Sequence, residues 1–423
     1  MTCKFFNINH LFFLLLIATA NAQNDSIKSW INKSTLTINR TNFELDSVFF
    51  EKNLKDEFSK VKVFGFGEAS HQHKEFFEVK TSFFKYLVIN YNVKYFFLEE
   101  SIGTAYKIDK YINGQEFDLK KIMVDFRQSI WETEEMYSLI QWIKNYNLDK
   151  DPNDRVRFYG IDTMFNYYID QIITQELLEE GVYVPQNISD ILRSLSNEDV
   201  QENRSELKVK ENEIRILKEF IENCKVADEK RNILNYALLR LTQYYQFLAN
   251  PSQVDRDKFM ADNIEFIANK KIKDANFFVW AHNEHIKKTK LIQTNITTIG
   301  NWLKQKFGDL YYSVGFGFGI GECKGVSSDG IWQRMEIKQP FKKTFSESLY
   351  EADKDIYFFD FKKALSNRYM NTFLNTKTDI VVIGGRGITE QNQKYIFSRE
   401  KPIEAFDAFV FLKKISLSTP LKE

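Results

Sequence analysis

The stretch VKVFGFGEASH (residues 61–71) decides the fold, because an apolar, β-prone run ends there directly in glycine and ionisable residues. Continuous apolar runs of this length are typical of strands buried on both faces, as in a parallel sheet. The next segment, KEFFEVKTSFFKYLVINYN (74–92), repeats apolar residues at helical spacing, and VKYFFLEES (93–101) again has the form of a buried strand. Strand, helix and strand in this order predict a βαβ unit.

Similar strand-like runs recur outward from this unit. They are VRFYGID (156–162), NFFVWAHNEH (276–285), YYSVGFGFG (311–319), DIVVIGG (379–385) and FDAFVFLKKI (406–415). Residues 165–275 instead form long, charged, amphipathic segments that are typical of helices. We therefore predict an α/β fold with a three-layer parallel-sheet core and a central helical insertion over 165–275. The two sheet-forming parts, 23–164 and 276–423, are also compatible with a duplicated α/β core.

Residues 1–22 have the layout of a cleavable signal peptide. Lys4 precedes an apolar run from Leu11 to Ile17, and the small-residue pattern Ala20-Asn21-Ala22 ends just before Gln23. The apolar run is far shorter than the ~20 residues that cross a bilayer, and no later stretch comes closer. We expect a protein that is secreted or periplasmic and has no membrane span.

Composition and motif content argue against several classes of function. The chain has 58 basic and 58 acidic residues, so no excess charge favours nucleic acid or anionic lipid as a partner. The nucleophile-elbow motif Gly-x-Ser-x-Gly is absent from the sequence, which argues against covalent serine catalysis.

Histidines and carboxylates are concentrated directly after the predicted strands. The histidines that remain after signal cleavage are His71, His73, His282 and His285. The carboxylates at the same strand ends are Glu68, Glu99, Glu100 and Asp162. In a parallel sheet, ligands bind beyond the carboxyl ends of the strands. A neutral imidazole there can take a proton from water, and a carboxylate can fix its tautomer, so we predict a water-activating cleft between the sheet and the helical insertion.

These residues resemble the erythromycin esterase family. The segment Gly67-Glu68-Ala69-Ser70-His71, followed by Glu75-Phe76, is similar to the family's Gly-Glu-x-x-His pattern and the helix after it. Further segments resemble the family in order: FLEES (97–101), WETEE (131–135), RFYGID (157–162) and WAHNEH (280–285). The resemblance covers nearly the whole mature chain.

The resemblance implies roles for individual residues. The histidine of Gly-Glu-x-x-His is regarded in the family as the general base that activates water, which implies this role for His71, with Glu68 as its carboxylate partner. It also makes His282 and His285 part of the pocket, where one of them would stabilise the oxyanion. Contacts with substrate are expected from Glu75, Lys80, Glu99, Glu100, Trp131 and Asp162. The implied reaction is cofactor-free hydrolysis of a carboxylic ester, with a macrolide lactone as the candidate substrate.

Alternatives remain open for several of these residues. Glu75 fits a solvated helix face as well as it fits a substrate contact. Lys80 stands where some family members have arginine, so it keeps the charge but loses the bidentate fork. Glu68 and the three clustered histidines could also bind zinc or manganese. Finally, 39 Phe and 20 Tyr could line the cleft of a pure binding protein, although most aromatics in a chain of this size belong to the core.

Overall fold

The computed structural model describes residues 25–39, 47–126, 128–196, 204–250, 256–292, 294–326, 331–385, 387–389 and 395–421. The signal peptide that we predict at residues 1–22 lies outside these ranges. No helix within them is both long enough and apolar enough to cross a membrane.

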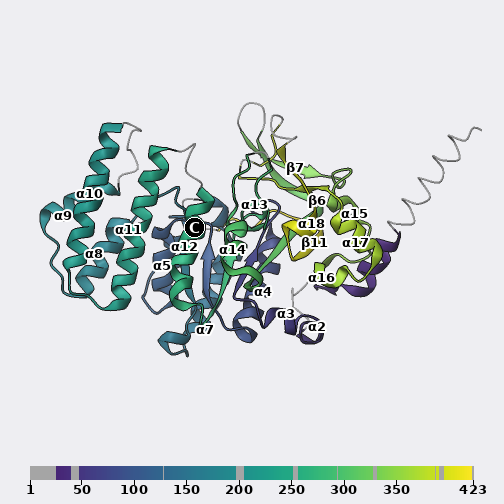
Figure 1. Ribbon diagram of the computed structural model, residues 1–423, viewed down its shortest axis with the longest axis horizontal. Helices are drawn as coiled ribbons and strands as arrows, with labels where there is room; N and C mark the ends of the chain where they lie inside the picture. The colour runs from purple at the N-terminus through teal and green to yellow at the C-terminus, as the bar shows by residue number, and fades with distance from the viewer. Residues whose placement is uncertain are drawn as a thin grey trace, which may run out of the picture.

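A mostly parallel sheet forms the centre of the molecule (Figure 1). Its strands are β1 (Leu36–Thr37), β2 (Val63–Phe66), β3 (Val93–Leu98), β4 (Arg157–Gly160), β5 (Asn276–Trp280), β6 (Tyr311–Val326), β7 (Trp332–Ile337), β8 (Ile356–Asp360) and β11 (Ala408–Ile415). Their order is β1-β8-β11-β6-β2-β5-β3-β4, and β7 pairs with β6 outside this path. The strands from β11 to β4 are parallel, whereas β1, β7 and β8 pair in antiparallel fashion. This confirms the predicted α/β fold.

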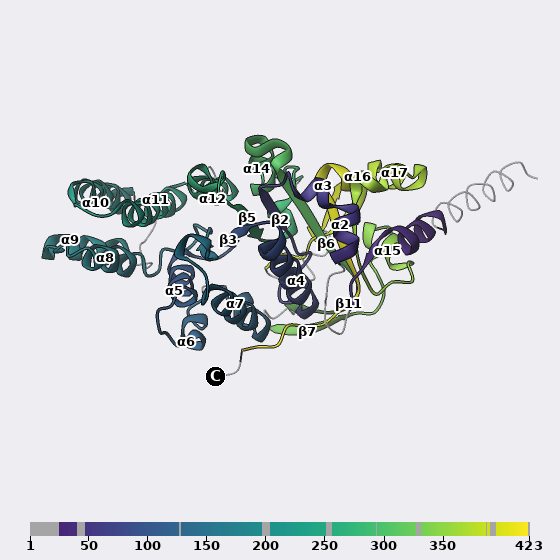
Figure 2. The same cartoon turned by 90° about the horizontal axis from the view of Figure 1, so that it is seen from below.

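Helices lie on both faces of the sheet (Figure 2). One face carries α4 (Lys74–Asn90) and α7 (Glu134–Asn147), and the other carries α12 (Arg256–Lys271) and α14 (Ile299–Phe307). The connecting helices are α2 (Ser47–Asn53), α3 (Lys55–Phe58), α5 (Ile102–Ile112), α6 (Leu119–Met123), α13 (Asn283–Ile286), α15 (Phe345–Tyr350), α16 (Phe361–Ala364), α17 (Arg368–Asn375) and α18 (Pro402–Ala405). Residues 25–34 are also helical. Short 3-10 turns are η1 (Ser129–Trp131), η2 (Pro152–Asp154) and η3 (Gly308–Leu310).

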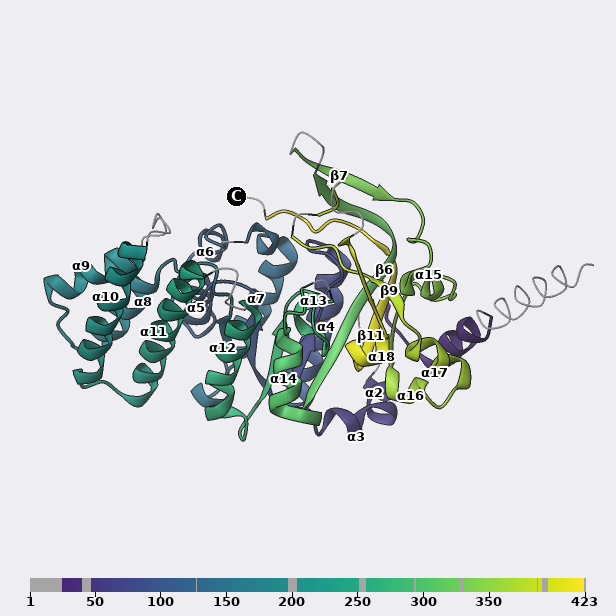
Figure 3. The same cartoon turned by 45° about the horizontal axis from the view of Figure 1, so that its top comes forward.

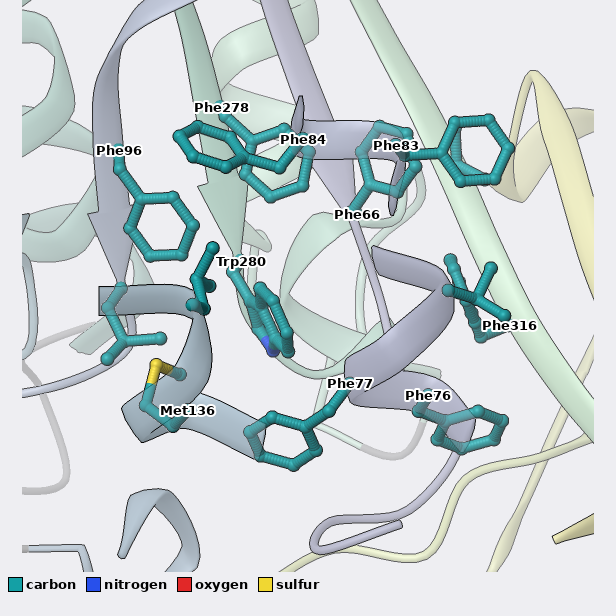
Figure 4. Packing of buried hydrophobic residues seen from close by; sticks show 14 of the residues in the cluster. Phe66, Phe76, Phe77, Phe83, Phe84, Phe96, Met136, Phe278, Trp280 and Phe316 are labelled. Carbon is teal, nitrogen blue, oxygen red and sulfur yellow. The ribbon is translucent and has the colours of Figure 1, made fainter. Parts of the chain in front are cut away.

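Stacked phenylalanines hold α4 on the sheet (Figure 4). Phe66 of β2 and Phe278 of β5 stack with ring centroids 4.8 Å apart, and Phe84 of α4 packs against Phe278 at 5.2 Å. Burying one such ring stabilises the fold by roughly 1.5–3 kcal/mol relative to exposure. This packing fixes the position of the other buried side chains on α4, including Lys80.

Between β4 and β5 the described chain is helical. It comprises α8 (Ile169–Glu179), α9 (Gln186–Leu195), α10 (Arg204–Asn223), α11 (Asp228–Ala249) and α12. Helices α8 to α11 stack beside the β4 edge of the sheet, and α12 returns onto the sheet (Figures 1 and 2). Tyr236 of α11 donates a hydrogen bond to the Gly160 carbonyl (3.0 Å), and Asp109 accepts one from the Phe158 amide (2.8 Å). These contacts satisfy backbone groups that an open edge strand would expose.

The strand pairing differs from the sequence prediction in two places. The run at 379–385 contributes β9 (Thr378–Val381), which pairs with β10 (Phe397–Glu400) in a separate two-stranded antiparallel sheet. The edge of the main sheet is instead extended by β8, antiparallel to β11, while β6 and β7 form a hairpin that projects beyond the sheet (Figure 3). Both differences arise because a short apolar run indicates a strand but not its partner or direction.

Candidate active site

The strand order brings four loops to one edge of the sheet. Strands β2, β5, β3 and β4 are neighbours and parallel, so their carboxyl ends lie together. These loops carry Glu68 and His71, His282 and His285, Glu99 and Glu100, and Asp162, in that spatial order. The rings of His71 and His282 lie 5.0 Å apart, centroid to centroid. The predicted residues of the four loops therefore form one site.

His71 is bound to a buried carboxylate. Its Nδ1 lies 2.6 Å from Glu68 Oε1, and the two side chains are 11% and 1% exposed. The other oxygen of Glu68 accepts hydrogen bonds from the Lys80 ammonium and from Trp280 Nε1, the latter at 3.2 Å. With Glu68 as acceptor at Nδ1, a neutral His71 carries its proton on Nδ1 and leaves Nε2 as a proton acceptor.

The charge of Glu68 is balanced inside the protein. Burial by itself raises the pKa of this carboxyl, but Lys80 and His71 outweigh burial and bring it to about 2. The Lys80 ammonium is completely buried and lies 3.9 Å from the centre of the Trp280 ring, and burial lowers its pKa. Lys80 thus contacts Glu68 inside the protein and is itself fully buried.

The loop after His71 has an unusual backbone. Gln72 adopts φ = 62°, a left-handed conformation that is uncommon for residues other than glycine. Its side chain donates to the Ser129 carbonyl (3.2 Å), which helps to hold the turn. Two residues after His71, His73 is completely buried against Phe318, and burial lowers its pKa to about 4. His73 therefore belongs to the core and not to the cleft.

His282 presents a buried N–H group. Its Nδ1 accepts from the Glu284 amide (3.3 Å), so the proton of the neutral ring is on Nε2. Burial lowers the pKa of His282 to about 3, which keeps the ring neutral. Within the described part of the chain, Nε2 has no hydrogen-bond partner. Because an unsatisfied buried donor is costly, this atom is a candidate for binding a ligand oxygen.

His285 lies between two carboxylates. Its Nδ1 is 2.8 Å from Asp257 Oδ1, and its Nε2 is 3.3 Å from Glu99 Oε1. Burial alone lowers the pKa of His285, but Asp257 and Glu99 together raise it well above the usual value. The two carboxylates therefore favour the charged form of His285.

An arginine from the helical insertion completes this group. Arg256 donates to Glu99 Oε1 (3.0 Å) and, through two nitrogens, to Asp162 (2.9 and 2.6 Å). Sequence reasoning missed both Arg256 and Asp257, which occupy the first turn of α12. A charged pair at the start of an amphipathic helix is indistinguishable in sequence from an ordinary solvated turn.

Three other predicted residues form hydrogen bonds with neighbouring loops. Glu100 accepts from the amides of Ser101 (2.7 Å) and Gln128 (3.1 Å), and burial raises its pKa to about 7. Trp131 is fully buried and donates to the Glu99 carbonyl at 3.2 Å. Glu75 accepts from the amide (2.7 Å) and hydroxyl (2.8 Å) of Ser416. These contacts brace the loops around the histidine cluster, and a substrate contact by any of the three stays a prediction.

Two further features bear on ligand binding. Within the described ranges, no three His, Cys, Asp or Glu side chains are placed to hold a metal ion together. A cavity of about 750 Å³ lies near the amino ends of β3, β4 and β5, among α5, α11 and α12, and no histidine occurs among its described lining residues. It is therefore distinct from the histidine cluster.

Comparison with known proteins identifies the family. The sequence model of the erythromycin esterase family matches residues 90–415. The chain belongs to the erythromycin esterase family. The match begins after the segment with Glu68 and His71, so these two residues are assigned by the resemblance of their motif and by their position in the fold.

Individual erythromycin esterase relatives are distant. The chain is 22% identical to the Bacillus subtilis protein YbfO, a suggested hydrolase, over 78% of this chain and 80% of the relative. It is 23% identical to erythromycin esterase type II of Escherichia coli, over 62% of this chain and 70% of the relative. The family supports an esterase or hydrolase activity for the chain.

Solved structures share the fold. A Bacillus cereus protein has a TM-score of 0.80 at 22% identity, covering 94% of this chain and 99% of the other. A succinoglycan biosynthesis protein has a TM-score of 0.78 at 19% identity, covering 95% and 99%. A mutant of the erythromycin esterase EreC, in its open conformation, has a TM-score of 0.62 at 15% identity, covering 92% and 99%. At these identities the likeness concerns the fold alone.

Proposed function

We propose that the protein hydrolyses a carboxylic ester with a water molecule that His71 activates. The observation that carries this proposal is the contact of His71 Nδ1 with Glu68, whose second oxygen is bound by Lys80 and Trp280. This arrangement directs the acceptor nitrogen of His71 away from Glu68. A positioned base of this kind typically contributes 10²- to 10⁴-fold to a rate.

The proposed reaction has two proton transfers. His71 Nε2 takes a proton from water while the water oxygen bonds to the ester carbonyl carbon. The resulting imidazolium is stabilised by Glu68, and the carbonyl oxygen, now negative, accepts a hydrogen bond from His282 Nε2. When the carbon–oxygen bond of the ester breaks, His71 returns the proton to the leaving alkoxide. The products are a carboxylic acid and an alcohol, and His71 is again neutral.

A macrolide lactone such as erythromycin is the proposed substrate, and resistance to such antibiotics is one role that would follow. The family and the Escherichia coli relative's name support this choice. The test is mass spectrometry of purified protein incubated with erythromycin and with a panel of simpler esters. Turnover adds the mass of one water to a lactone, and no turnover of any ester would contradict the proposal.

The same assay separates imidazole catalysis from a metal-dependent reaction by the same Glu and His cluster. If His71 alone activates water, exhaustive chelation should leave the rate within about twofold, because a metal that acidifies bound water supplies several kcal/mol that nothing else replaces. Loss of activity on chelation, with recovery on adding zinc or manganese, would favour the metal mechanism. Binding without turnover would favour an exported binding protein.

We also propose export to the periplasm or the medium. The mature protein should begin near Gln23, because the small-residue pattern that precedes this position fits signal-peptidase cleavage. N-terminal sequencing of protein from fractionated cells checks this. An intact Met1 on the functional protein would contradict it.

A further inference from the structure

His285, which follows β5, contacts two charged residues of the helical insertion, Arg256 and Asp257. Asp257, in the first turn of α12, is 4% exposed and accepts from the Ile299 amide at the start of α14 (3.0 Å). Its carboxylate oxygens lie 2.8 and 3.0 Å from His285 Nδ1. Asp257 thus joins α12, α13 and α14 at one buried point. A charged His285 offsets part of the cost of burying this carboxylate.

The contact network continues from His285 to His282. His285 Nε2 lies 3.3 Å from Glu99 Oε1, and Glu99 Oε2 accepts from the His282 main-chain amide at 3.0 Å. The path from Asp257 through His285 and Glu99 therefore ends on the backbone of the residue whose unpartnered Nε2 faces a ligand in the proposed reaction.

We infer that Asp257 is a positioning residue that keeps His285 as an imidazolium, so that His285 holds Glu99 on the His282 backbone and does not act as a base. This inference rests on the proposed function for its catalytic consequence. The charge state of His285 is tested separately, because its measurement does not depend on ester hydrolysis.

Charged and titratable groups from each neighbouring element support the inference. Asp257 and Arg256 face His285 from α12, and Glu99 faces it from the loop after β3. His282 precedes His285 on the loop after β5, and the ring centroids of these two histidines lie 6.5 Å apart. Arg256 is itself bound by Asp162, which follows β4. Three carboxylates thus meet Arg256 and one imidazole, and protonation of that imidazole brings the group closer to neutrality.

The two ring nitrogens of His285 have different surroundings: Nδ1 faces Asp257 (2.8 Å), whereas Nε2 faces Glu99 Oε1 (3.3 Å) and also lies 3.4 Å from Arg256 Nη1. A general base needs one nitrogen without a proton. At His285, loss of the Nδ1 proton would place a nitrogen lone pair against the Asp257 carboxylate. At His71, Nδ1 faces Glu68, and Nε2 is the nitrogen that acts as the base in the proposed reaction.

The test is nitrogen-15 NMR of the histidine rings in the full-length mature protein between pH 6 and 9. We expect both His285 nitrogens to remain protonated at pH 8. In Asp257→Asn the ring should lose a proton within this range, and Asp257→Glu should restore the charge. Glu284→Gln is the matched control, because it also removes one carboxylate near His285 but the Glu284 side chain pairs with Lys287. A neutral His285 at pH 7 in the unaltered protein would overturn the inference without any variant.

Activity provides the second readout on any ester that the parent protein hydrolyses. Asp257→Asn should lower kcat at pH 8 by up to the roughly 10²-fold that one misplaced oxyanion donor costs, with little change in KM. Activity should partly recover at lower pH, as His285 regains its proton, whereas a purely structural defect would not follow pH. An unchanged pH profile in a folded Asp257→Asn protein would also overturn the inference. If no ester is hydrolysed, the proposed function fails while the NMR result still tests the charge of His285.

Discussion

His71 and His285 occupy the same edge of the sheet and both have a carboxylate at Nδ1, yet their surroundings give them opposite properties. The partner of His71 is Glu68, whose other oxygen is bound to the buried Lys80. The partner of His285 is Asp257, and a second carboxylate, Glu99, faces its other nitrogen. Neighbouring charge therefore decides whether an imidazole serves as an acceptor or as a fixed cation.

The largest effect is expected from replacing His71, the histidine that acts as the proton acceptor in the proposed reaction. His71→Asn should lower kcat by about 10²- to 10⁴-fold with little change in stability, because a positioned base typically contributes that much. Glu68→Gln should also slow turnover, and the double variant should be hardly slower than the worse single one, since both act on one proton path. Steady-state kinetics on a hydrolysed ester measures this.

Gln72→Asn is the control for His71→Asn, because asparagine tolerates the left-handed backbone of that position and the Gln72 side chain is turned to Ser129. It should retain most activity. Full activity in a folded His71→Asn protein would remove His71 as the base.

The next expected effect concerns Lys80. This lysine makes the surroundings of the two histidines different, because it pairs with Glu68, the partner of His71. Lys80→Met leaves a buried carboxylate without its cation, so the free energy of unfolding should fall by about 3–5 kcal/mol. Lys80→Arg keeps the charge and should lose less. Urea unfolding at pH 7 measures both variants, and equal stability of Lys80→Met and the parent protein would contradict the buried ion pair.

The smallest expected effect is the pH dependence of stability, which has opposite signs for His282 and His285. The folded-state pKa of His282 is lowered to about 3. The unfolded chain therefore takes up a proton near pH 6.5 before the native state does, and stability falls as the pH decreases from about 6.5 toward 3. The pKa of His285 is raised, so its contribution is fully present below about 6.5 and is lost as the pH rises through the folded-state value.

Urea midpoints at pH 5, 6.5 and 9 measure these contributions. Each of the buried neutral histidines, His73 and His282, is expected to contribute a loss on the order of 2 kcal/mol between pH 6.5 and 5, since one pKa unit corresponds to about 1.4 kcal/mol. His282→Asn should reduce the acid loss, and Asp257→Asn should reduce the alkaline loss. The same pH response in both variants would remove the distinction between the two histidines.

Much of the site could be predicted from local sequence. The segment 61–71 combines a buried strand with a polar exit, so Glu68 and His71 were expected at a strand's carboxyl end, where the structure places them. The same reasoning held for the loop after β5. Helical spacing could also have separated Glu75 from Lys80, because residues five apart on a helix point in different directions. The structure indeed directs one to Ser416 and the other to Glu68.

The sequence by itself determined the βαβ unit, the helical character of 165–275 and the set of residues that end up at the edge, because these depend on patterns within about 20 residues. Only the tertiary structure decided that β5 lies between β2 and β3, which brings His282 beside His71. It also decided that Arg256 reaches Asp162, 94 residues earlier in the chain. Strand order and the return of α12 depend on how whole faces pack against one another, and a local pattern specifies which face is apolar but not which other face will cover it.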